Sequence, residues 1–471
     1  MTELAMQSLT EVAKVLHAGT LSPIELTRTM LERIEREDSR FHSYVTVLSD
    51  VALAQAKVAE EEIRAGQIRG PLHGIPIAVK DLCFTKGIAT SCGSQMFTDW
   101  IPDVDATVVT KLADAGAILL GKLHMTEFAL RWHHPYRPIP LNPWGKDLWP
   151  GVSSSGSGVA TAAGLCFGSL GSDTGGSIRF PAASCGIVGL KPTYGRVSRY
   201  GVFPLGESLD HIGPLTRRTA DAAAMLGAIA GYDPLDATSS VCPVPDYMAT
   251  LEEGVNELRI GVDDTYITEG VHPEVSASVQ QAIRVLVEMG AQVVEVTVPG
   301  ISAVLDAWYP MTAAEAAAAH EEFFPDRANE YGPFRQLLED GTQLRAQDYA
   351  KAHFVREEFA SRLAPIFNQI DLLICPTIST PTPRMDAEGN AVMEAMGDND
   401  SYVRTRFTYP FNFSRNPTLS LPCGVSNDGR PISLQFVGRH FDEATLFRAG
   451  HAFEQATEWH KKRGMLIGNG G

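Results

Sequence analysis

One stretch constrains this chain more than any other: two loops of small residues separated by a run of small apolar residues. The first loop, at 151–158, reads Gly-Val-Ser-Ser-Ser-Gly-Ser-Gly, and the second, at 171–177, reads Gly-Ser-Asp-Thr-Gly-Gly-Ser. Residues 159–168 between them are mostly alanine, glycine and apolar residues, which predicts a buried, closely packed helix. Taken alone, each glycine- and serine-rich cluster would be typical of a turn or linker.

A lone lysine follows an apolar run upstream of these loops. Residues 74–79 read Gly-Ile-Pro-Ile-Ala-Val, and Lys80 and Asp81 come next. Alone, this pattern is typical of a strand that ends at the solvent. In a buried strand, however, the lysine would lose its hydration, which lowers its pKa from about 10.4 and allows it to act as a base.

In this order, the lysine and the two loops resemble the motifs of the amidase signature enzymes. Similar segments occur at 121–128, 185–198 and 419–424, and the resemblance extends from near residue 8 to the C-terminus. It implies an α/β fold in which a large, mixed, twisted β-sheet lies between two layers of helices (α/β/α). It also implies a Ser–Ser–Lys triad of Lys80, Ser153 and Ser177, with a cis bond between Val152 and Ser153.

The resemblance implies acyl transfer. Neutral Lys80 would draw a proton from Ser153, which draws one from Ser177, and Ser177 would attack a carbonyl carbon to form an acyl-enzyme. Glycines near the nucleophile leave backbone amides unobstructed, as an oxyanion hole requires. We expect this hole to be formed by the amides of Thr174, Gly175, Gly176 and Ser177.

Four neighbours of these residues are expected to support them. Asp173 and Arg179 flank the nucleophile, and we expect them to form an ion pair that holds its loop. Ser154 and Ser155 are either turn serines or hydrogen-bonding supports within the first loop.

The sequence departs from the family pattern in two places. Val152 stands where glycine is most usual, and residues 130–149 read LRWHHPYRPIPLNPWGKDLW where many members carry a glycine-rich stretch. We expect Trp132 and Tyr136 of this segment to lie near the substrate entrance, which predicts an apolar or aryl substrate. The alternative is a loop that merely packs on the surface.

Other chemistries find less support. The chain has no G-x-S-x-G elbow and no Ser-x-x-Lys motif. Cys83 and Cys185 lie near the motifs, but small buried thiols of this kind are usually structural. The adjacent His133 and His134 would point apart on a strand, and no companion lies at ligand spacing, so no metal site is predicted.

Length and motif spacing bear on domain organisation. The 471 residues would allow three domains at about 150 residues each, but the motifs span 80–177 and return near residue 420. We therefore expect a single domain. Its expected parts are N-terminal wrapping helices (1–70), a catalytic core (71–215) and the remaining sheet with pocket helices and loops (216–471).

Composition narrows the possible partners. A net charge of −17 without a basic face argues against nucleic acid. Seven cysteines, an odd number without a C-x-x-C pair, are typical of reduced thiols in a cytoplasmic protein. There is no signal-peptide pattern and no run of roughly 18 apolar residues, so no membrane span is expected. We expect a small-molecule amide or carbamate substrate, no cofactor, and a monomer or homodimer.

Hydrophobic periodicity predicts alternating helices and strands, as in an α/β sheet covered on both faces. Ser22 and Pro23 form a typical helix start. The predicted helices are 9–18, 22–37, 49–65, 106–115, 273–289 and 342–368, and the predicted strands are 75–79, 117–121, 259–262, 292–298, 372–375 and 419–422.

The function that this reasoning favours is hydrolysis of a small apolar or aryl amide, with anilides and carbamates (urethanes) accessible to the same chemistry. A first alternative is the glutaminase subunit of a tRNA-dependent amidotransferase. That subunit must hold the α-amino group of glutamine, and residues 402–409 contain no acid for this purpose. A second alternative is a non-catalytic scaffold, which the intact Lys80, Ser153 and Ser177 disfavour.

Overall fold

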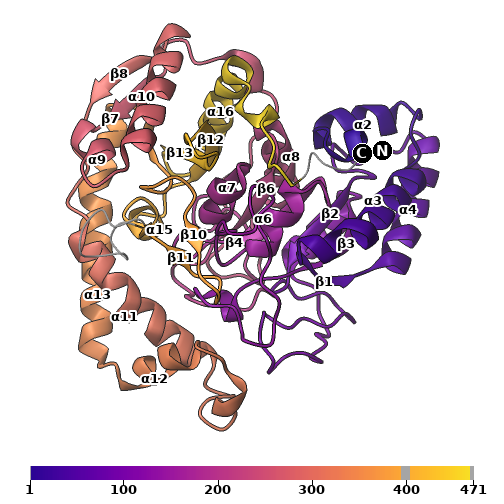
Figure 1. Cartoon of the computed structure of the whole chain (residues 1–471), viewed down its shortest axis with the longest axis horizontal. Helices are drawn as coiled ribbons and strands as arrows, with labels where there is room; N and C mark the ends of the chain where they lie inside the picture. The colour runs from indigo at the N-terminus through magenta and orange to yellow at the C-terminus, as the bar shows by residue number, and fades with distance from the viewer. Residues whose placement is uncertain (1, 394–403, 467–471) are drawn as a thin grey trace.

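An eleven-stranded mixed β-sheet forms the centre of this computed structural model, which describes residues 2–393 and 404–466 (Figure 1). The strand order is β1-β3-β2-β4-β6-β5-β12-β13-β9-β7-β8. These strands are β1 Tyr44–Val47, β2 Pro76–Lys80, β3 Ile118–Leu123, β4 Gly168–Ser172, β5 Val188–Lys191, β6 Ile212–Thr216, β7 Arg259–Val262, β8 Gln292–Glu295, β9 Leu372–Pro376, β12 Thr418–Val425 and β13 Pro431–Gly438. A separate hairpin pairs β10 (Arg384–Met385) with β11 (Ala391–Val392).

The register of the inner strands brings two motifs together. β2 is parallel to both β3 and β4, and Val79 of β2 lies opposite Leu170 of β4. The carboxyl ends of the two strands, Lys80 and Ser172, are therefore neighbours at one edge of the sheet. Parallel pairing thus joins residues that are 92 positions apart in the sequence.

Helices cover both faces of the sheet. α6 and α7 contact each other, whereas α8 and α16 contact each other, and both pairs pack on β5 or β6, whose residues are buried throughout. The two pairs therefore occupy opposite faces, and the α/β/α architecture is confirmed. The helices are α1 Thr2–Ala5, α2 Leu9–His17, α3 Pro23–Glu37, α4 Ser49–Arg64, α5 Thr107–Asp114, α6 Ser155–Ala162, α7 Arg179–Cys185, α8 Thr219–Ile229, α9 Asp264–Thr268, α10 Pro273–Glu288, α11 Ser302–Ala319, α12 Arg335–Gln343, α13 Ala346–Leu363, α15 Tyr409–Phe413 and α16 Glu443–Thr457.

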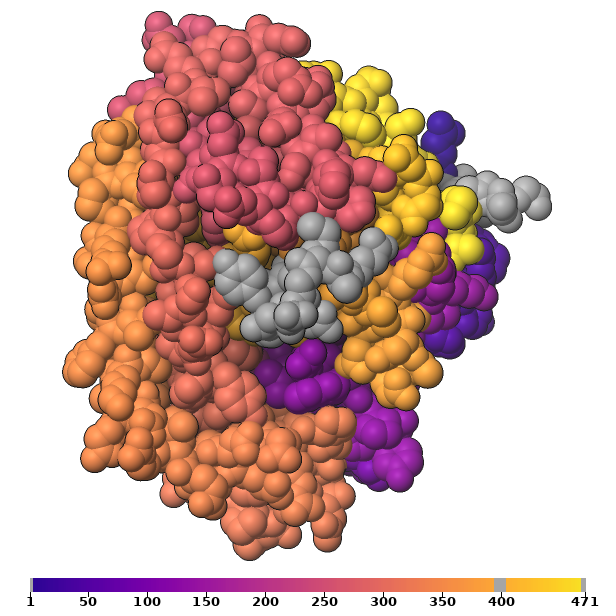
Figure 2. All heavy atoms as spheres, turned by 60° about the vertical axis from the view of Figure 1, so that its left-hand side comes forward, coloured from indigo at the N-terminus to yellow at the C-terminus, as the bar shows by residue number. Residues whose placement is uncertain are grey.

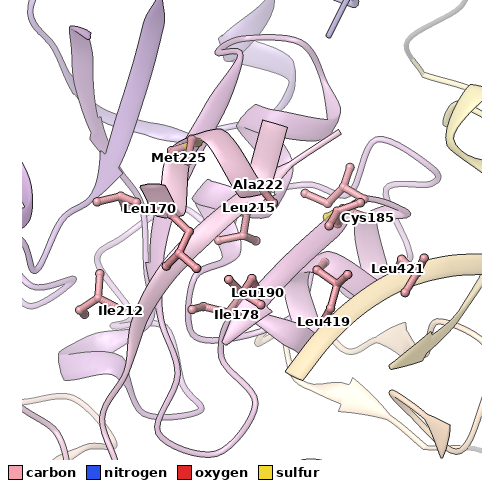
Figure 3. Packing of buried hydrophobic residues seen from close by; sticks show 14 of the residues in the cluster. Leu170, Ile178, Cys185, Leu190, Ile212, Leu215, Ala222, Met225, Leu419 and Leu421 are labelled. Carbon is pink, nitrogen blue, oxygen red and sulfur yellow. The ribbon is translucent and has the colours of Figure 1, made fainter. Parts of the chain in front are cut away.

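The core lies between these layers (Figure 3). Leu170, Leu190, Leu215 and Leu419, each from a different central strand, are fully buried and belong to one cluster. Burying one leucine contributes about 1.5–3 kcal/mol, so this continuous contact holds early and late parts of the chain in one body.

The α11–α13 region forms one side of the molecule. Figure 2 shows its salmon and orange residues beside purple residues from the first third of the chain. α11 contacts α12, α13 and α15, so it joins the peripheral helices to the segment after residue 404.

Most of the predicted elements are present, with ends that differ by a few residues. The helix expected at 159–168 is displaced: α6 begins at Ser155 and ends at Ala162. Gly164 adopts a left-handed conformation (φ 67°) that terminates the helix, and Gly168 already begins β4. The strand expected at 292–298 ends earlier, at Glu295.

The single helix expected at 342–368 is wrong. α12 ends at Gln343, α13 covers Ala346–Leu363, and a 3₁₀ helix follows at Ala364–Asn368. Leu344 is extended (ψ 132°) and breaks the first junction. Pro365 has no N–H group to continue an α-helix, which accounts for the second break.

Two further observations concern the described residues only. All seven cysteines are free thiols, and six of them are buried. Within residues 2–393 and 404–466, the helices are too short or too polar to cross a membrane.

Asp221 of α8 ties α2 to the body. Its carboxylate accepts hydrogen bonds from Ser8 Oγ (2.6 Å), Leu9 N (3.0 Å) and Thr10 N (3.1 Å) at the start of α2. We expect Asp221→Ala to lower the free energy of unfolding by about 2–4 kcal/mol, because two backbone N–H groups lose their acceptor.

Thermal denaturation followed by circular dichroism measures this loss. Asp50→Ala, at an exposed position in the first turn of α4, is the control and should cost less than about 1 kcal/mol. Equal melting temperatures for Asp221→Ala and the unmodified protein would show that this carboxylate does not anchor α2.

Candidate active site

Lys80 lies at the centre of the site. It is the last residue of β2 and its side chain is fully buried. Its Nζ donates hydrogen bonds to Ser153 Oγ at 2.6 Å and to Ser172 Oγ at 2.8 Å. The lysine that the sequence singled out is therefore in direct contact with the expected bridging serine.

Burial changes the acid–base behaviour of this lysine. Loss of hydration lowers the pKa of Lys80 to about 7, although Cys83, Asp210 and Asp173 act in the opposite direction. An ordinary lysine is almost entirely protonated at neutral pH, whereas about half of Lys80 is neutral at pH 7. Lys80 can therefore accept a proton under ordinary conditions.

Ser153 precedes α6, and the peptide bond between Val152 and Ser153 is cis, as expected from the resemblance. Its carbonyl accepts a hydrogen bond from Thr126 N at 3.2 Å. The neighbouring Ser154 Oγ donates to the Ser172 carbonyl at 3.2 Å, which ties the first loop to the end of β4. Ser154 thus supports the site through the residue that also contacts Lys80.

Ser155, the other expected support, contacts a histidine of the 130–137 segment. Its Oγ lies 3.1 Å from Nε2 of the buried His133. It therefore fixes the 130–137 segment against the start of α6. His133 and His134 lie in this loop, not in a strand.

Ser177 lies just before α7 and lines a cavity. Its carbonyl accepts a hydrogen bond from Ser154 N at 3.3 Å, so its backbone lies beside the first loop. Within the described residues its hydroxyl has no hydrogen-bond partner. The Lys80–Ser153 half of the expected relay is thus closed and the Ser153–Ser177 half is open, as is common before substrate binds.

Asp173 organises the loop that carries Ser177. It forms the expected ion pair with Arg179 (2.9 Å), in which both side chains are fully buried, and it also accepts from Ile178 N at 3.1 Å. Burial would raise the pKa of Asp173, but Arg179, Lys191 and Asn412 lower it well below its ordinary value. The carboxylate is therefore ionised and holds the loop at all but very acidic pH.

One member of the expected oxyanion hole is already engaged. Gly176 N donates to Asp173 Oδ1 at 2.7 Å, so this amide cannot also face a developing oxyanion. The amides of Thr174, Gly175 and Ser177 have no acceptor among the described residues. Gly176 therefore drops out of the set, and its part is to shape the turn with φ 127°.

Thr174 is held from two sides. Its hydroxyl donates to Asp210, and its carbonyl accepts from Trp308 Nε1 at 3.0 Å. Trp308 in turn stacks on Tyr409, with ring centroids 4.4 Å apart. Asp210 and Trp308 thus hold Thr174 directly, and Tyr409 supports Trp308 by stacking on it.

The cavity that Ser177 lines has a volume of about 140 Å³. This matches the roughly 150 Å³ of a cavity that accepts a benzene ring. Its lining residues are Ala129, Leu130, Arg131, Trp132, Val152, Thr174, Gly175, Ser177, Phe180, Leu205, Leu305, Trp308, Tyr309, Arg404, Thr405 and Tyr409.

The structure separates the two aromatic residues expected at the entrance. Trp132 lines the cavity and is half-buried. Tyr136 is 78% exposed and does not line the cavity, and its ring lies beside that of the buried His134. The three residues between them carry the chain out of the cavity wall, so only Trp132 is kept as a candidate substrate contact.

The two cysteines considered as alternative nucleophiles, Cys83 and Cys185, are buried in surroundings that disfavour the reactive thiolate. Burial raises the pKa of the Cys83 thiol to about 11 and that of Cys185 further still, so both remain protonated at neutral pH. Among the described residues, no three His, Cys, Asp or Glu side chains are grouped to hold a metal ion.

Sequence reasoning missed several residues of this site. Ser172 lies in the second small-residue loop, next to Asp173. Its place in that motif was the one signal in the sequence for its contact with Lys80 at the end of the neighbouring strand. Asp210, Trp308 and Tyr409 carried no such signal, because they are remote in sequence and lie outside the motif segments.

Comparisons with known proteins agree with this geometry. The Amidase family model matches residues 25–447. A protein of Mycobacterium tuberculosis named "Putative amidase AmiD" is 45% identical over 460 residues, covering 97% of this chain and 95% of that protein. A glutamyl-tRNA(Gln) amidotransferase subunit of Moorella thermoacetica is 41% identical over 484 residues, covering 97% of this chain and 98% of that protein.

A solved structure agrees as well. A bacterial aryl acylamidase of the amidase signature family superposes with a TM-score of 0.88 at 25% identity, covering 97% of this chain and 98% of that one. The chain therefore belongs to the amidase signature family and is a hydrolase of that family acting on C–N bonds.

Proposed function

We propose that the chain hydrolyses small apolar or aryl amides through an acyl-enzyme, with Ser177 as nucleophile, Ser153 as proton relay and Lys80 as base. One observation carries the proposal: a buried lysine with a pKa near 7 contacts Ser153 at 2.6 Å beside a cavity of ring size that Ser177 lines. Carbamates are accessible to the same chemistry. Cytoplasmic location and a monomeric or homodimeric state stay predictions.

The reaction proceeds in two stages, acylation of Ser177 and hydrolysis of the acyl-enzyme. Neutral Lys80 accepts a proton from Ser153 as Ser153 accepts one from Ser177, and the Ser177 oxygen bonds to the carbonyl carbon. The C–N bond then breaks, and the proton returns from Lys80 through Ser153 to the leaving amine. A water molecule, deprotonated through the same relay, hydrolyses the acyl-enzyme and releases Ser177.

The negative charge that develops on the carbonyl oxygen during attack must be stabilised by hydrogen-bond donors. The backbone amides of Thr174, Gly175 and Ser177 are the candidates, because they have no other acceptor among the described residues. Loss of one such donor typically reduces kcat by about 10²–10³-fold. The hydrogen bonds that hold Thr174 keep these donors in place before the substrate arrives.

The aryl preference follows from the cavity wall. Trp132, Phe180, Trp308 and Tyr409 all line it, and stacked or edge-on rings stabilise an aryl group by about 0.5–1.5 kcal/mol beyond the area they bury. The similar aryl acylamidase structure is consistent with this choice.

A glutaminase role remains the second candidate, favoured by the 41% identity to the amidotransferase protein of Moorella thermoacetica. The described residues 404–409 include no acidic side chain for an α-amino group, and Tyr402 and Val403 of the same segment lie outside the described residues. A panel of anilides, aryl carbamates, aliphatic amides and glutamine separates the candidates. Rapid turnover of glutamine alone would replace the aryl-amide proposal.

We expect Ser177→Ala to retain less than about 1% of the hydrolytic activity, because it removes the covalent nucleophile. Its melting temperature should stay close to that of the unmodified protein, since the hydroxyl makes no hydrogen bond within the described residues. Mass spectrometry after treatment with a sulfonyl fluoride should locate one adduct, on Ser177. An adduct on another residue, with activity retained in Ser177→Ala, would reject this assignment.

The pH dependence should report the ionisation of Lys80. The neutral amine is the active form, so kcat/KM should rise about tenfold per pH unit below pH 7 and level off above about pH 8. Lys80→Met should remove this limb together with most of the activity. A rate that is constant from pH 5 to pH 9 would contradict Lys80 as the base.

Replacement of Trp132 tests the aryl preference. Trp132→Ala should raise KM for anilides by about ten- to thirtyfold and change kcat less, because the ring contributes binding common to ground and transition states. The effect on short aliphatic amides should be smaller. Tyr136→Ala, four residues away but outside the cavity, is the matched control and should leave both substrates unchanged. Equal losses for both classes in Trp132→Ala would mean that Trp132 is structural.

A further inference from the structure

Two arginines line the cavity that contains Ser177. Arg131 comes from the loop after β3, and Arg404 comes from the segment before α15 and is only 9% exposed. None of the described lining residues is acidic. The cavity therefore combines aromatic walls with two fixed positive charges, which a purely apolar substrate would not use.

Both charges act on the same part of the cavity. Burial raises the pKa of Tyr409 to about 12, and Arg404 and Arg131 are the groups that oppose this rise. Both guanidinium groups therefore lie within Coulombic reach of the Tyr409 phenol, which also lines the cavity. Arg131 also lies over the Trp132 ring at 5.2 Å, which places its charge next to the aromatic wall.

The positions of the two side chains are set by the protein. Arg404 has interactions with other residues, so it is held in the wall and is not a mobile surface chain. Arg131 is exposed, but its stacking on Trp132 limits its freedom. Guanidinium groups fixed in this way bind carboxylates with two parallel hydrogen bonds at a small entropic cost.

The overall charge makes this local feature more significant. The chain carries a net charge of −17, so its long-range field repels an anionic molecule. Arg131 and Arg404 place two positively charged side chains in the wall of the cavity.

We propose that the substrate of this enzyme is an amide that carries a carboxylate on its apolar or aryl body, bound by Arg131 and Arg404. The inference rests on the proposed function, because it names the class of amide that the same site accepts. A carboxylate between the two guanidinium groups would leave the apolar body against the aromatic walls. Its amide carbonyl would then lie beside Ser177.

Two matched substrate pairs test the proposal. On the acyl side, N-(para-nitrophenyl)succinamate is compared with para-nitrobutyranilide, and on the amine side, para-acetamidobenzoate is compared with para-methylacetanilide. We expect the carboxylate of at least one pair to raise kcat/KM by about tenfold or more over its neutral partner. The preference should weaken in about 1 M NaCl, because salt screens charges that are partly exposed to water.

Three variants locate the effect. Arg131→Met and Arg404→Met should each reduce the carboxylate-to-neutral ratio by about tenfold, and Arg131 can be replaced even where the buried Arg404 is required for folding. Arg64→Met, at an exposed arginine of α4 on the opposite side of Figure 1, is the control and should keep the ratio. Equal or better turnover of the neutral partner in both pairs would overturn the proposal, as would a ratio that survives both variants.

Binding distinguishes this inference from the proposed function. Isothermal titration of Ser177→Ala with the same four compounds measures affinity without turnover. If none of the four is hydrolysed, the aryl-amide proposal fails, and the titration still decides the carboxylate site. The site is supported if Ser177→Ala binds a carboxylate more tightly than its neutral partner and if this difference is lost when the protein also carries Arg131→Met. Equal binding overturns it.

Discussion

The buried carboxylate of Asp173 is the interaction on which the active site depends. It accepts hydrogen bonds from Gly176 N and Ile178 N and forms an ion pair with Arg179 at 2.9 Å, so one side chain fixes the whole turn between β4 and α7. Removing one member of a buried pair leaves an uncompensated charge and typically costs about 3–5 kcal/mol. Arg179 also donates to Asn412 Oδ1 at 2.6 Å, which connects the turn to a segment more than 200 positions later. The geometry around Ser177 is therefore tied to the position of α15, which lies far along the chain.

The second constraint is the exclusion of water from Lys80. A lysine beside solvent would stay protonated, whereas the parallel strands β2 and β4 and the start of α6 enclose this one. Its two hydroxyl partners satisfy the amine without adding a negative charge, and the nearby acids Asp173 and Asp210 raise its pKa only in part. A carboxylate in direct contact would have kept the lysine protonated and unable to accept a proton. The choice of serines as partners is therefore as important as burial itself.

Local patterns predicted what is local in this molecule. Lys80 at a strand end, the glycine-rich loops and the Asp173–Arg179 pair all lie within short segments whose chemistry is visible in the residues. The structure corrected those features that depend on geometry beyond a segment. Gly176 looked like any other glycine of its loop until Asp173 was seen to engage its amide, and Tyr136 could not be told from Trp132 by residue type. Trp308 and Tyr409 reach the site only because distant elements pack together, which no periodicity in one sequence reveals.

The origin of the cavity walls has a consequence for how such enzymes diversify. Lys80, Ser153 and Ser177 come from strands and loops at the centre of the sheet. Apart from Phe180 of α7, the aromatic and charged wall residues come from the 130–137 loop, from α11 and from the segment that runs from Arg404 into α15. In the proposed mechanism, substitutions in the walls alter which molecule is admitted and leave the proton relay intact. Under that mechanism, a change of substrate requires only substitutions in these peripheral segments, because none of them carries a residue of the relay.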